Sequence, residues 1–252
     1  MGASLRSGKK PVLKLEGVSK NFGGVVAASD INVELYAREV FGLIGPNGAG
    51  KTTLVNLITG IYQADRGKVL LNGRDITKLP TYMRARLGIA RSFQHPRLLN
   101  RCDIYTNIYM GADLASRRTK NSNADNDMAM LLKAAALEKV DLSGSISKLS
   151  YGQQKLLELV RAILSDPYVL LLDEPAAGLN SREMDYVAAL IRIAVEKDIA
   201  VLLIEHAMDF VMSICDWITV LNFGHQIAED TPEEIQVNQT VIDSYLGGNV
   251  HA

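Results

Sequence analysis

The chain has 252 residues, of which 48% are hydrophobic and 22% are charged, which are ordinary proportions for a globular protein with a full apolar core. Its net charge of −1 and pI near 6.4 exclude the strongly basic character of proteins that bind nucleic acid along a whole face. The longest apolar runs, residues 169–172 and 199–204, are far shorter than the roughly 20 residues that span a bilayer. The short polar N-terminus also lacks the apolar run of a secretory signal. We therefore expect a soluble chain with Cys102 and Cys215 as reduced thiols, and any membrane role must come through a partner.

Extended segments and a helix flank a glycine-rich loop in the first third of the chain. Residues 12–18, 28–35 and 39–44 are expected to be strands, and residues 51–59 are expected to form a helix directly after the loop. Residues 68–76 should form a hairpin, because its central Asn-Gly pair tolerates the positive φ angles of a tight turn. These early strands predict an antiparallel β subdomain at the N-terminus.

The middle of the chain, residues 94–149, is expected to be a mostly helical insertion. Within it, residues 116–127 are polar and show no periodicity, which indicates a loop. Residues 128–139 are rich in Ala, Leu and Met, which favour a helix.

Regular alternation of helices and strands follows the insertion. The expected helices are residues 153–164 and 182–196, the expected strands are residues 168–172 and 200–204, and residues 233–246 should add two short helices. Short, nearly all-apolar strands between helices indicate a parallel sheet that is covered on both faces. The fold class is therefore α/β.

The glycine-rich loop carries the pattern G-x-x-x-x-G-K-[ST] from Gly45 to Thr52. Its glycines let successive backbone N–H groups wrap around phosphate oxygens, and the following helix directs its positive end toward them. Lys51 should neutralise the β- and γ-phosphates of ATP, the Thr52 hydroxyl should coordinate Mg²⁺, and Thr53 should donate to the α-phosphate. The predicted nucleotide-binding loop comprises Gly45, Pro46, Asn47, Gly48, Ala49, Gly50, Lys51, Thr52 and Thr53. A glycine-rich surface turn is the alternative, but it does not explain the strand before the loop and the helix after it.

Two carboxylates, Asp173 and Glu174, come directly after the apolar strand at residues 168–172. Ligands of open parallel sheets bind at the carboxyl ends of the strands. We therefore expect Asp173 to face the Mg²⁺ that Thr52 holds, and Glu174 to act on the attacking water as a general base. A strand that simply ends in solvent is the alternative.

A second anion-binding element is predicted at the start of the helix that precedes this strand. Ser150 and Gln153 fit a capping box, in which each side chain bonds the backbone N–H of the other residue. The Ser150 hydroxyl, the Gly152 N–H and the positive end of the helix together form a potential phosphate site. A well-capped helix with no ligand is the alternative.

The motifs in this order resemble those of the ABC-type ATPases. Residues 149–153 resemble the family's L-S-G-G-Q signature, and Phe22 resembles the aromatic residue that stacks on adenine. Gln94 resembles the glutamine that contacts Mg²⁺ and the attacking water, and His206 resembles the histidine that contacts the γ-phosphate. Each residue alone has an ordinary alternative: core packing for Phe22, a surface position for Gln94 and helix capping for His206.

Two positions depart from the general family pattern. Tyr151 replaces the first signature glycine, and Asn180 replaces the usual aspartate of the family's D-loop, although it can cap the next helix together with Glu183. Both departures are usual in the ATP-binding subunits of branched-chain (hydrophobic) amino-acid importers, which this chain resembles in further segments. These segments are residues 88–98, 150–154, 175–180, 231–235 and 245–247. The urea importers and lipopolysaccharide exporters are near relatives, and their ATPases are alternatives.

The resemblance implies one ATPase domain at residues 11–247. Its RecA-like P-loop core would comprise residues 11–93 and 150–230, with a helical subdomain at residues 94–149 and a tail at residues 231–252. The catalytic residues implied are Glu174, His206 and Gln94.

The resemblance also implies partners. Each ATP would lie between the phosphate loop of one subunit and the signature residues of a second ATPase subunit, either an identical copy or a paralogue. These signature residues are Ser150, Tyr151, Gly152 and Gln153. Integral permease subunits, and in an importer a periplasmic solute-binding protein, would complete an assembly on the cytoplasmic face of the inner membrane. Nucleic acid is not an expected partner.

Two other functions remain possible at this point. A soluble ABC ATPase acting on DNA or ribosomes would carry long coiled coils or two ATPase halves, and this chain shows neither. A small-molecule kinase would use the phosphate loop but would leave Ser150, Gln153 and His206 without a role.

Overall fold

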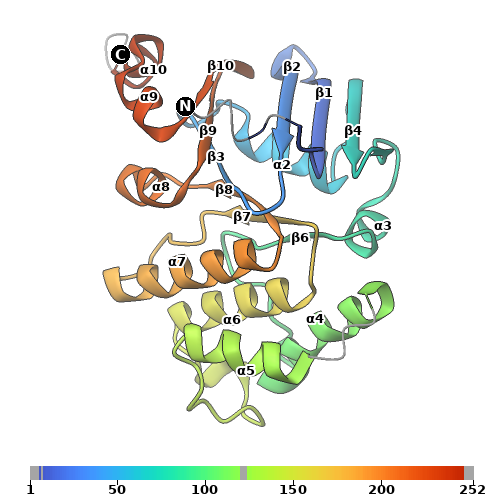
Figure 1. Ribbon diagram of the computed structural model, residues 1–252, viewed down its shortest axis with the longest axis vertical. Coiled ribbons are helices and arrows are strands. Elements are labelled where there is room, and N and C mark those ends of the chain that lie inside the picture. The colour runs from blue at the N-terminus through green and yellow to red at the C-terminus, as the bar shows by residue number, and fades with distance from the viewer. Residues whose placement is uncertain (1–5, 7, 120–123, 247–252) are drawn as a thin grey trace.

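The computed structural model describes Arg6, residues 8–119 and residues 124–246. It contains two β-sheets: the larger crosses the middle of the molecule, with a layer of helices below it and the smaller sheet above it (Figure 1). The strands are β1 (Leu13–Phe22), β2 (Val25–Leu35), β3 (Val40–Ile44), β4 (Arg66–Leu71), β5 (Arg74–Asp75), β6 (Ile89–Arg91), β7 (Val169–Asp173), β8 (Ala200–Ile204), β9 (Trp217–Asn222) and β10 (His225–Asp230). The helices are α2 (Lys51–Thr59), α3 (Thr81–Arg86), α4 (Ile104–Thr119), α5 (Ala124–Ala134), the short 3₁₀ helix η1 (Ile146–Lys148), α6 (Tyr151–Leu164), α7 (Ser181–Glu196), α8 (Met208–Ile214), α9 (Pro232–Val237) and α10 (Gln239–Leu246).

The larger sheet has six strands in the order β10-β9-β3-β8-β7-β6. Strands β9, β3, β8, β7 and β6 run parallel, and only β10 is antiparallel to its neighbour. The carboxyl ends of the parallel strands therefore meet at one edge, where the phosphate loop follows β3 and the acidic pair ends β7. The smaller sheet, in the order β2-β1-β4-β5, is antiparallel throughout.

The central strands are apolar on both faces, because each face packs against a different layer. On β7, Leu170 and Leu172 belong to the core shared with α6 and α7, whereas Val169 and Leu171 belong to the core shared with the antiparallel sheet and α2. Strand β8 alternates in the same way. This two-sided burial explains why these strands are continuous apolar runs in the sequence.

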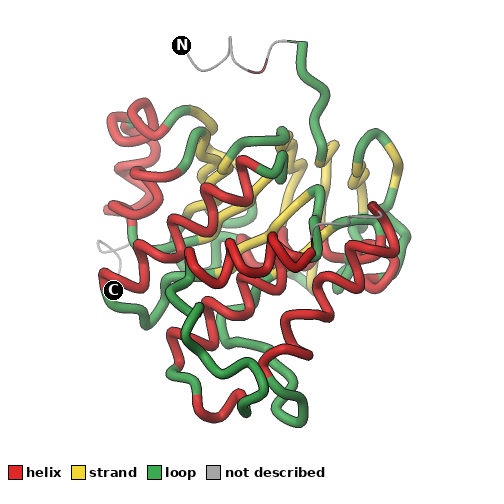
Figure 2. Tube along the Cα trace, turned by 60° about the horizontal axis from the view of Figure 1, so that its bottom comes forward, coloured by secondary structure: helices red, strands yellow, loops and turns green. Residues whose placement is uncertain are grey.

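The helical layer on one side of the parallel sheet contains α6 at its centre. Helices α4, α5 and α7 all pack against α6, and the grouping of the helices beside the strands is visible in Figure 2. No helix in the ranges 8–119 and 124–246 has the combination of length and apolar character that crossing a bilayer requires.

Most predicted elements are confirmed, including the hairpin turn, where Asn72 and Gly73 both have positive φ. The loop expected at residues 116–127 is wrong: α4 continues to Thr119 and α5 begins at Ala124, while residues 120–123 lie outside the described part. Helix α4 extends into this polar stretch because buried Ala112 and Ala115 face the core while charged residues occupy the exposed side.

Helix α5 also differs from the helix expected at residues 128–139. It begins four residues earlier, with Asp125 and Asp127 in its first turn, where negative charge is favourable near the helix N-terminus. It ends at Ala134, because Ala136 adopts a positive φ of 52° that breaks the helix.

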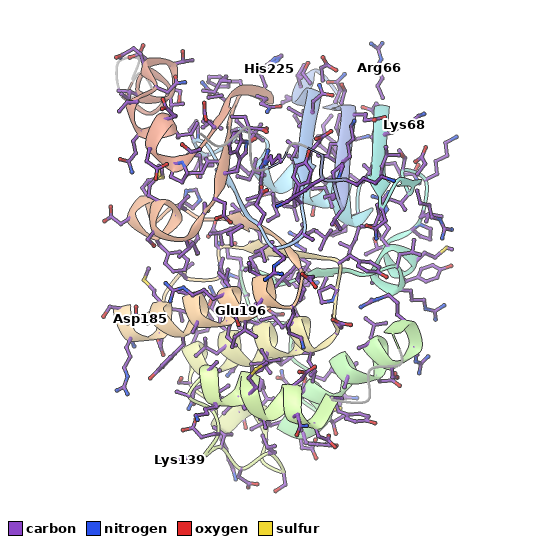
Figure 3. All side chains as sticks on the ribbon, viewed as in Figure 1. Arg66, Lys68, Lys139, Asp185, Glu196 and His225 are labelled. Atoms are coloured by element: carbon purple, nitrogen blue, oxygen red, sulfur yellow. The ribbon has the colours of Figure 1, made fainter. Side chains whose placement is uncertain are left out.

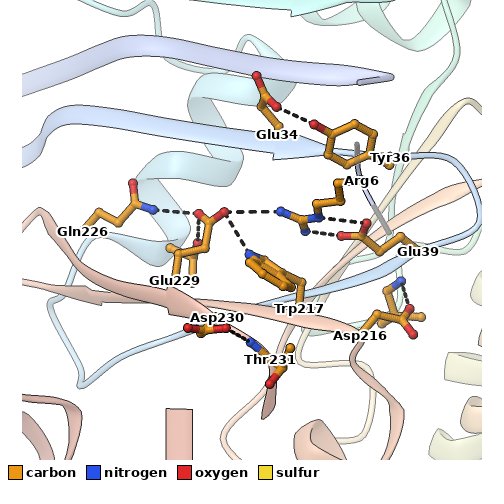
Figure 4. Close-up of polar contacts among 12 residues, drawn as sticks. Arg6, Glu34, Tyr36, Glu39, Asp216, Trp217, Gln226, Glu229, Asp230 and Thr231 are labelled. Atoms are coloured by element: carbon orange, nitrogen blue, oxygen red, sulfur yellow. Dashed lines mark hydrogen bonds and ion pairs between the residues drawn. The ribbon is translucent and has the colours of Figure 1, made fainter. Parts of the chain in front are cut away.

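At the amino ends of the parallel strands, Arg6 links the N-terminal segment to the core (Figure 4). Its guanidinium donates to Glu39 and Glu229 and lies 4.2 Å from the ring centroid of Trp217. Other charged side chains extend from the outside of the molecule, such as Arg66 and Lys68 on β4 and Lys139 at the opposite end (Figure 3). The contacts of Arg6 therefore lie at the end of the sheet opposite the phosphate loop.

Candidate active site

The phosphate loop between β3 and α2 depends on two close backbone approaches. A Cβ on Gly45 would lie 2.1 Å from the Leu221 carbonyl oxygen, and a Cβ on Gly50 would lie 2.3 Å from the Ala27 carbonyl oxygen. Both glycines also have positive φ. Only glycine satisfies both conditions, so the neighbouring strands fix the shape of the loop at these positions.

The loop lines a cavity of about 230 Å³ together with β2 residues and the ends of β7 and β8. Lys51 is buried in its wall, and its Nζ donates to the carbonyl oxygens of Gly45 at 2.6 Å and Pro46 at 3.1 Å. Burial lowers the pKa of Lys51, and the nearby charges of Glu174 and Asp173 oppose this effect. A buried ammonium bonded to neutral carbonyls favours an anionic ligand, and phosphate fits this cavity.

Glu174, directly after β7, lies between two other predicted catalytic residues. Gln94 Nε2 donates to Glu174 Oε2 at 2.9 Å, and His206 Nε2 lies 3.1 Å from Glu174 Oε1. Glu174 has a positive φ of 52°, which costs about 1–2 kcal/mol for a residue with a side chain. The structure thus brings the three predicted catalytic side chains together through a strained backbone position.

The strained loop at Glu174 is held by side chains from elsewhere in the chain. Lys155, buried on α6, donates from Nζ to the carbonyl oxygens of Glu174 at 2.7 Å and Ala177 at 2.9 Å. Glu205, also buried, accepts the Ala176 N–H at 2.6 Å. Bonds from a charged group are stronger than neutral ones, so they stabilise the unusual backbone conformation.

Helix α6 also holds the segment that carries Gln94. Glu158 accepts the backbone N–H groups of Phe93 at 3.2 Å and Arg97 at 2.8 Å, and burial raises the pKa of this carboxyl. The Tyr151 hydroxyl donates to the Gln94 carbonyl oxygen at 3.2 Å. Tyr151, Lys155 and Glu158 are spaced four and three residues apart, so they lie on one side of the helix. One face of α6 therefore positions both the loop that begins at Glu174 and the segment that carries Gln94.

The oxygen-rich residues expected at the metal lie near this group. Thr52 lines the cavity, Asp173 ends β7, and Gln94 contacts Glu174. Hydroxyl, carboxylate and amide oxygens are hard ligands that suit Mg²⁺, so the donor set fits this metal. The described residues contain no group of three or more His, Cys, Asp or Glu side chains that could hold a metal, and so an ion here would need oxygens from a nucleotide or water.

Asp173 also has a partner that the sequence did not suggest. Arg91 at the end of β6 donates from Nη2 to Asp173 Oδ2 at 2.7 Å and from Nη1 to Asn56 Oδ1 at 2.7 Å. Asn56 lies on α2, so Arg91 connects the helix after the phosphate loop with the acidic pair.

The signature residues do not line the cavity of their own subunit. Ser150 Oγ accepts the Gln153 N–H at 3.2 Å, and Gln153 Oε1 accepts the Ser150 N–H at 2.9 Å, which confirms the capping box. Gly152 faces the Glu183 carboxylate, because a Cβ there would lie 2.1 Å from Glu183 Oε1. Tyr151 is 42% exposed. The start of α6 is thus separate from the cavity, with Ser150 and Tyr151 exposed and Gly152 buried against Glu183.

Phe22 also lies outside the cavity wall, which Val25 and Val26 form on that side. It is 41% exposed and packs edge-on against Tyr62, with ring centroids 5.0 Å apart. Asn180 caps α7 with Glu183, as expected.

The residues that sequence reasoning missed are Lys155, Glu158, Glu205 and Arg91. Lys155 and Glu158 did leave a signal, because both are charged residues at buried positions among the leucines of α6. Their partners are distant in sequence, and no local pattern indicates them.

The fold and the cavity define a P-loop nucleotide hydrolase. A family profile described as "ABC transporter" matches residues 28–177, and one described as "Branched-chain amino acid ATP-binding cassette transporter" matches residues 225–251. The chain belongs to the ABC transporter ATPases.

Relatives match along nearly the whole chain. The high-affinity branched-chain amino acid transport ATP-binding protein BraF of Pseudomonas aeruginosa is 40% identical over 255 residues, covering 94% of this chain and 98% of the relative. The corresponding LivG protein of Escherichia coli is 39% identical over 251 residues, with the same coverage. A solved ATP-binding cassette of an ABC transporter in its ADP conformation has a TM-score of 0.81 and 28% identity, covering 94% of this chain and 99% of that one.

Proposed function

We propose that this chain is the ATP-hydrolysing subunit that powers a membrane importer of branched-chain amino acids. The observation that carries this proposal is the similarity to branched-chain amino-acid transport ATPases over 94% of the chain. The match of a branched-chain transporter profile to residues 225–251 supports it independently of the phosphate loop.

In this proposal the phosphate loop binds ATP. The buried Lys51 ammonium releases its carbonyl partners to neutralise the β- and γ-phosphates, while the loop's N–H groups and the start of α2 bind the remaining oxygens. Thr52, Asp173 and Gln94 would hold Mg²⁺, which would supply charge neutralisation at the γ-phosphate when bound. Phe22 contributes an aromatic face for adenine from its exposed position beside Tyr62.

Hydrolysis depends on Glu174 and its two neighbours. The Glu174 carboxylate accepts a proton from the attacking water, while the Gln94 amide and the His206 ring fix the orientation of that carboxylate. The distances of 2.9 Å and 3.1 Å from Gln94 and His206 to the Glu174 oxygens support these roles. His206 is then placed to contact the γ-phosphate as the site closes.

A second subunit completes the site in this proposal. The start of α6 carries the signature residues Ser150, Tyr151, Gly152 and Gln153, of which Ser150 and Tyr151 are exposed, and its positive helix end does not line the cavity of its own subunit. A second copy or a paralogue would bring this surface against the γ-phosphate. ATP would then hold the two subunits together until hydrolysis removes that contact.

We assign the expected domains accordingly, with a core at residues 11–93 and 150–230, a helical subdomain at residues 94–149 and a tail at residues 231–252. An apolar cavity of about 320 Å³ lies between this core and helical subdomain, and Phe93 and Arg91 form part of its wall. A permease segment seated there would contact the residues next to Gln94. The subunit would then act at the cytoplasmic face of the inner membrane, with a periplasmic binding protein that delivers the solute.

Uptake of labelled leucine, isoleucine and valine by cells that lack the gene tests this function. We expect uptake to be restored by the wild-type gene and not by the Lys51→Ala variant, because only the first binds ATP. Uptake of labelled urea serves as the comparison. Normal leucine uptake in the deletion strain, or restoration by Lys51→Ala, would refute the proposal.

A further inference from the structure

Arg91 occupies a connecting position between three parts of the molecule. Its side chain is only 10% exposed, and it extends from the end of β6 between α2 and the end of β7. One terminal nitrogen donates to Asn56 and the other donates to Asp173, each at 2.7 Å. The planar guanidinium has a fixed fork of donors, so the two bonds together define where the Asp173 carboxylate lies.

The bond to Asp173 involves a single carboxylate oxygen. Arg91 contacts Oδ2 of Asp173, and this contact leaves Oδ1 as the oxygen that can face Thr52 and the phosphates. Partners of this kind, which bond a metal ligand without touching the metal, orient the ligand and raise metal affinity. The Phe93 ring, whose centroid is 4.9 Å from the Arg91 guanidinium carbon, packs against the same group.

We propose that Arg91 is a positioning residue that fixes Asp173 for the divalent cation of the bound nucleotide, using Asn56 as its second anchor. The inference rests on the proposed ATP site and adds a role that the phosphate-loop and acidic motifs do not include. It distinguishes Arg91 from Lys51, because Lys51 acts on the phosphates and Arg91 acts on the metal ligand.

The test is the gain in ATP affinity that Mn²⁺ produces. Calorimetry measures ATP binding in EDTA and in excess MnCl₂, with every protein carrying Glu174→Gln so that ATP is not consumed. We expect Arg91→Met to leave the affinity in EDTA unchanged and to reduce the Mn²⁺-dependent gain about tenfold or more. An equal or larger gain in Arg91→Met would overturn the inference. The Arg91 guanidinium would then compete with Mn²⁺ for Asp173 instead of positioning Asp173 for it.

Asn56→Ala gives an independent arm that leaves the Arg91–Asp173 pair in place. We expect a smaller loss of the Mn²⁺-dependent gain from Asn56→Ala alone, and no further loss when it is added to Arg91→Met, because both act through one contact. An unchanged gain in Asn56→Ala, or additive losses in the double variant, would contradict the inference. If Arg91→Met does not fold, the Asn56→Ala arm still decides.

Failure of the proposed function has a different signature. If the protein with Glu174→Gln alone binds no ATP in EDTA or Mn²⁺, the ATP site itself is wrong. If this protein binds ATP with a clear Mn²⁺ gain that neither substitution changes, only the role of Arg91 is wrong.

Discussion

Two loops face each other across the candidate active site, and they are held in opposite ways. The phosphate loop, residues 45–53, is shaped by its own glycines and by backbone carbonyl groups of adjacent strands, such as that of Leu221. The loop that begins at Glu174 is held by buried charged side chains, Lys155 and Glu205, which lie 19 and 29 residues from the backbone groups that they bond. The groups that hold the phosphate loop therefore differ from those that hold the loop at Glu174. Substitutions should accordingly change ATP binding and ATP hydrolysis separately.

The largest effect should come from the residue at the centre of the second loop. Glu174→Gln removes the proposed base and preserves the shape of the side chain, so turnover should fall by about 10²- to 10⁴-fold while ATP affinity is retained. Lys51→Ala should do the reverse and weaken ATP binding itself. Phosphate release and calorimetry measure the two quantities. Normal steady-state turnover in Glu174→Gln would show that Glu174 is not the base.

A matched glycine pair tests the support of the phosphate loop. Gly45→Ala places a Cβ against the Leu221 carbonyl oxygen, so the free energy of unfolding should fall by about 3 kcal/mol. In Gly48→Ala the added Cβ has no atom within 4 Å, and the positive φ alone should cost about 1–2 kcal/mol. Chemical unfolding measures both. Equal losses would mean that the close approach to Leu221 does not shape the loop.

The end of the molecule opposite the phosphate loop, where Tyr36 lies beside Arg6, can be probed without touching the acidic loop. Burial and the hydrogen bond from the Tyr36 hydroxyl to Glu34 raise the pKa of Tyr36 to about 12. Because the folded state retains this proton more tightly than the unfolded state, stability is fully present below pH 10 and is lost as the pH rises toward about 12. The difference in unfolding free energy between wild type and Tyr36→Phe should therefore shrink over this interval. A constant difference from pH 9 to 12 would contradict this linkage.

The smallest effect is one of chemical reactivity. Burial raises the pKa of Cys215 to about 12, and its thiol lies against Gly42 of β3, which leads into the phosphate loop. A disulfide reagent at neutral pH should therefore modify the partly exposed Cys102 and spare Cys215 until the protein unfolds. Cys102→Ser should leave no rapidly reacting thiol. Rapid modification in this variant would show that the packing of Cys215 against β3 opens readily in the folded protein.

The same contrast explains what the sequence could predict. The phosphate loop, the helix that follows it and the two capping boxes are local, so residues a few positions apart determine them. The bond between Arg91 and Asp173 joins residues 82 positions apart, and no spacing rule indicates it. Polar composition was misleading at residues 116–119, where Arg117 pairs with Asp113 on the exposed face of α4 and the stretch is helical rather than a loop.

The separation of the two loops is tested most directly at Lys155. Lys155→Met removes the bonds to the Glu174 and Ala177 carbonyl groups and keeps an unbranched side chain that is one atom shorter. Lys148→Met is the matched control, because Lys148 is an exposed lysine three residues before the start of α6.

The measurement is kcat for ATP hydrolysis together with ATP affinity in the same preparations. The account predicts that Lys155→Met lowers kcat about 10- to 100-fold with unchanged ATP affinity, because a displaced Glu174 no longer lines up with the attacking water. Lys148→Met should match wild type in both quantities. An unchanged kcat in Lys155→Met, or a loss of ATP affinity that accounts for the whole effect, would contradict the claim that α6 holds the catalytic loop independently of the phosphate loop.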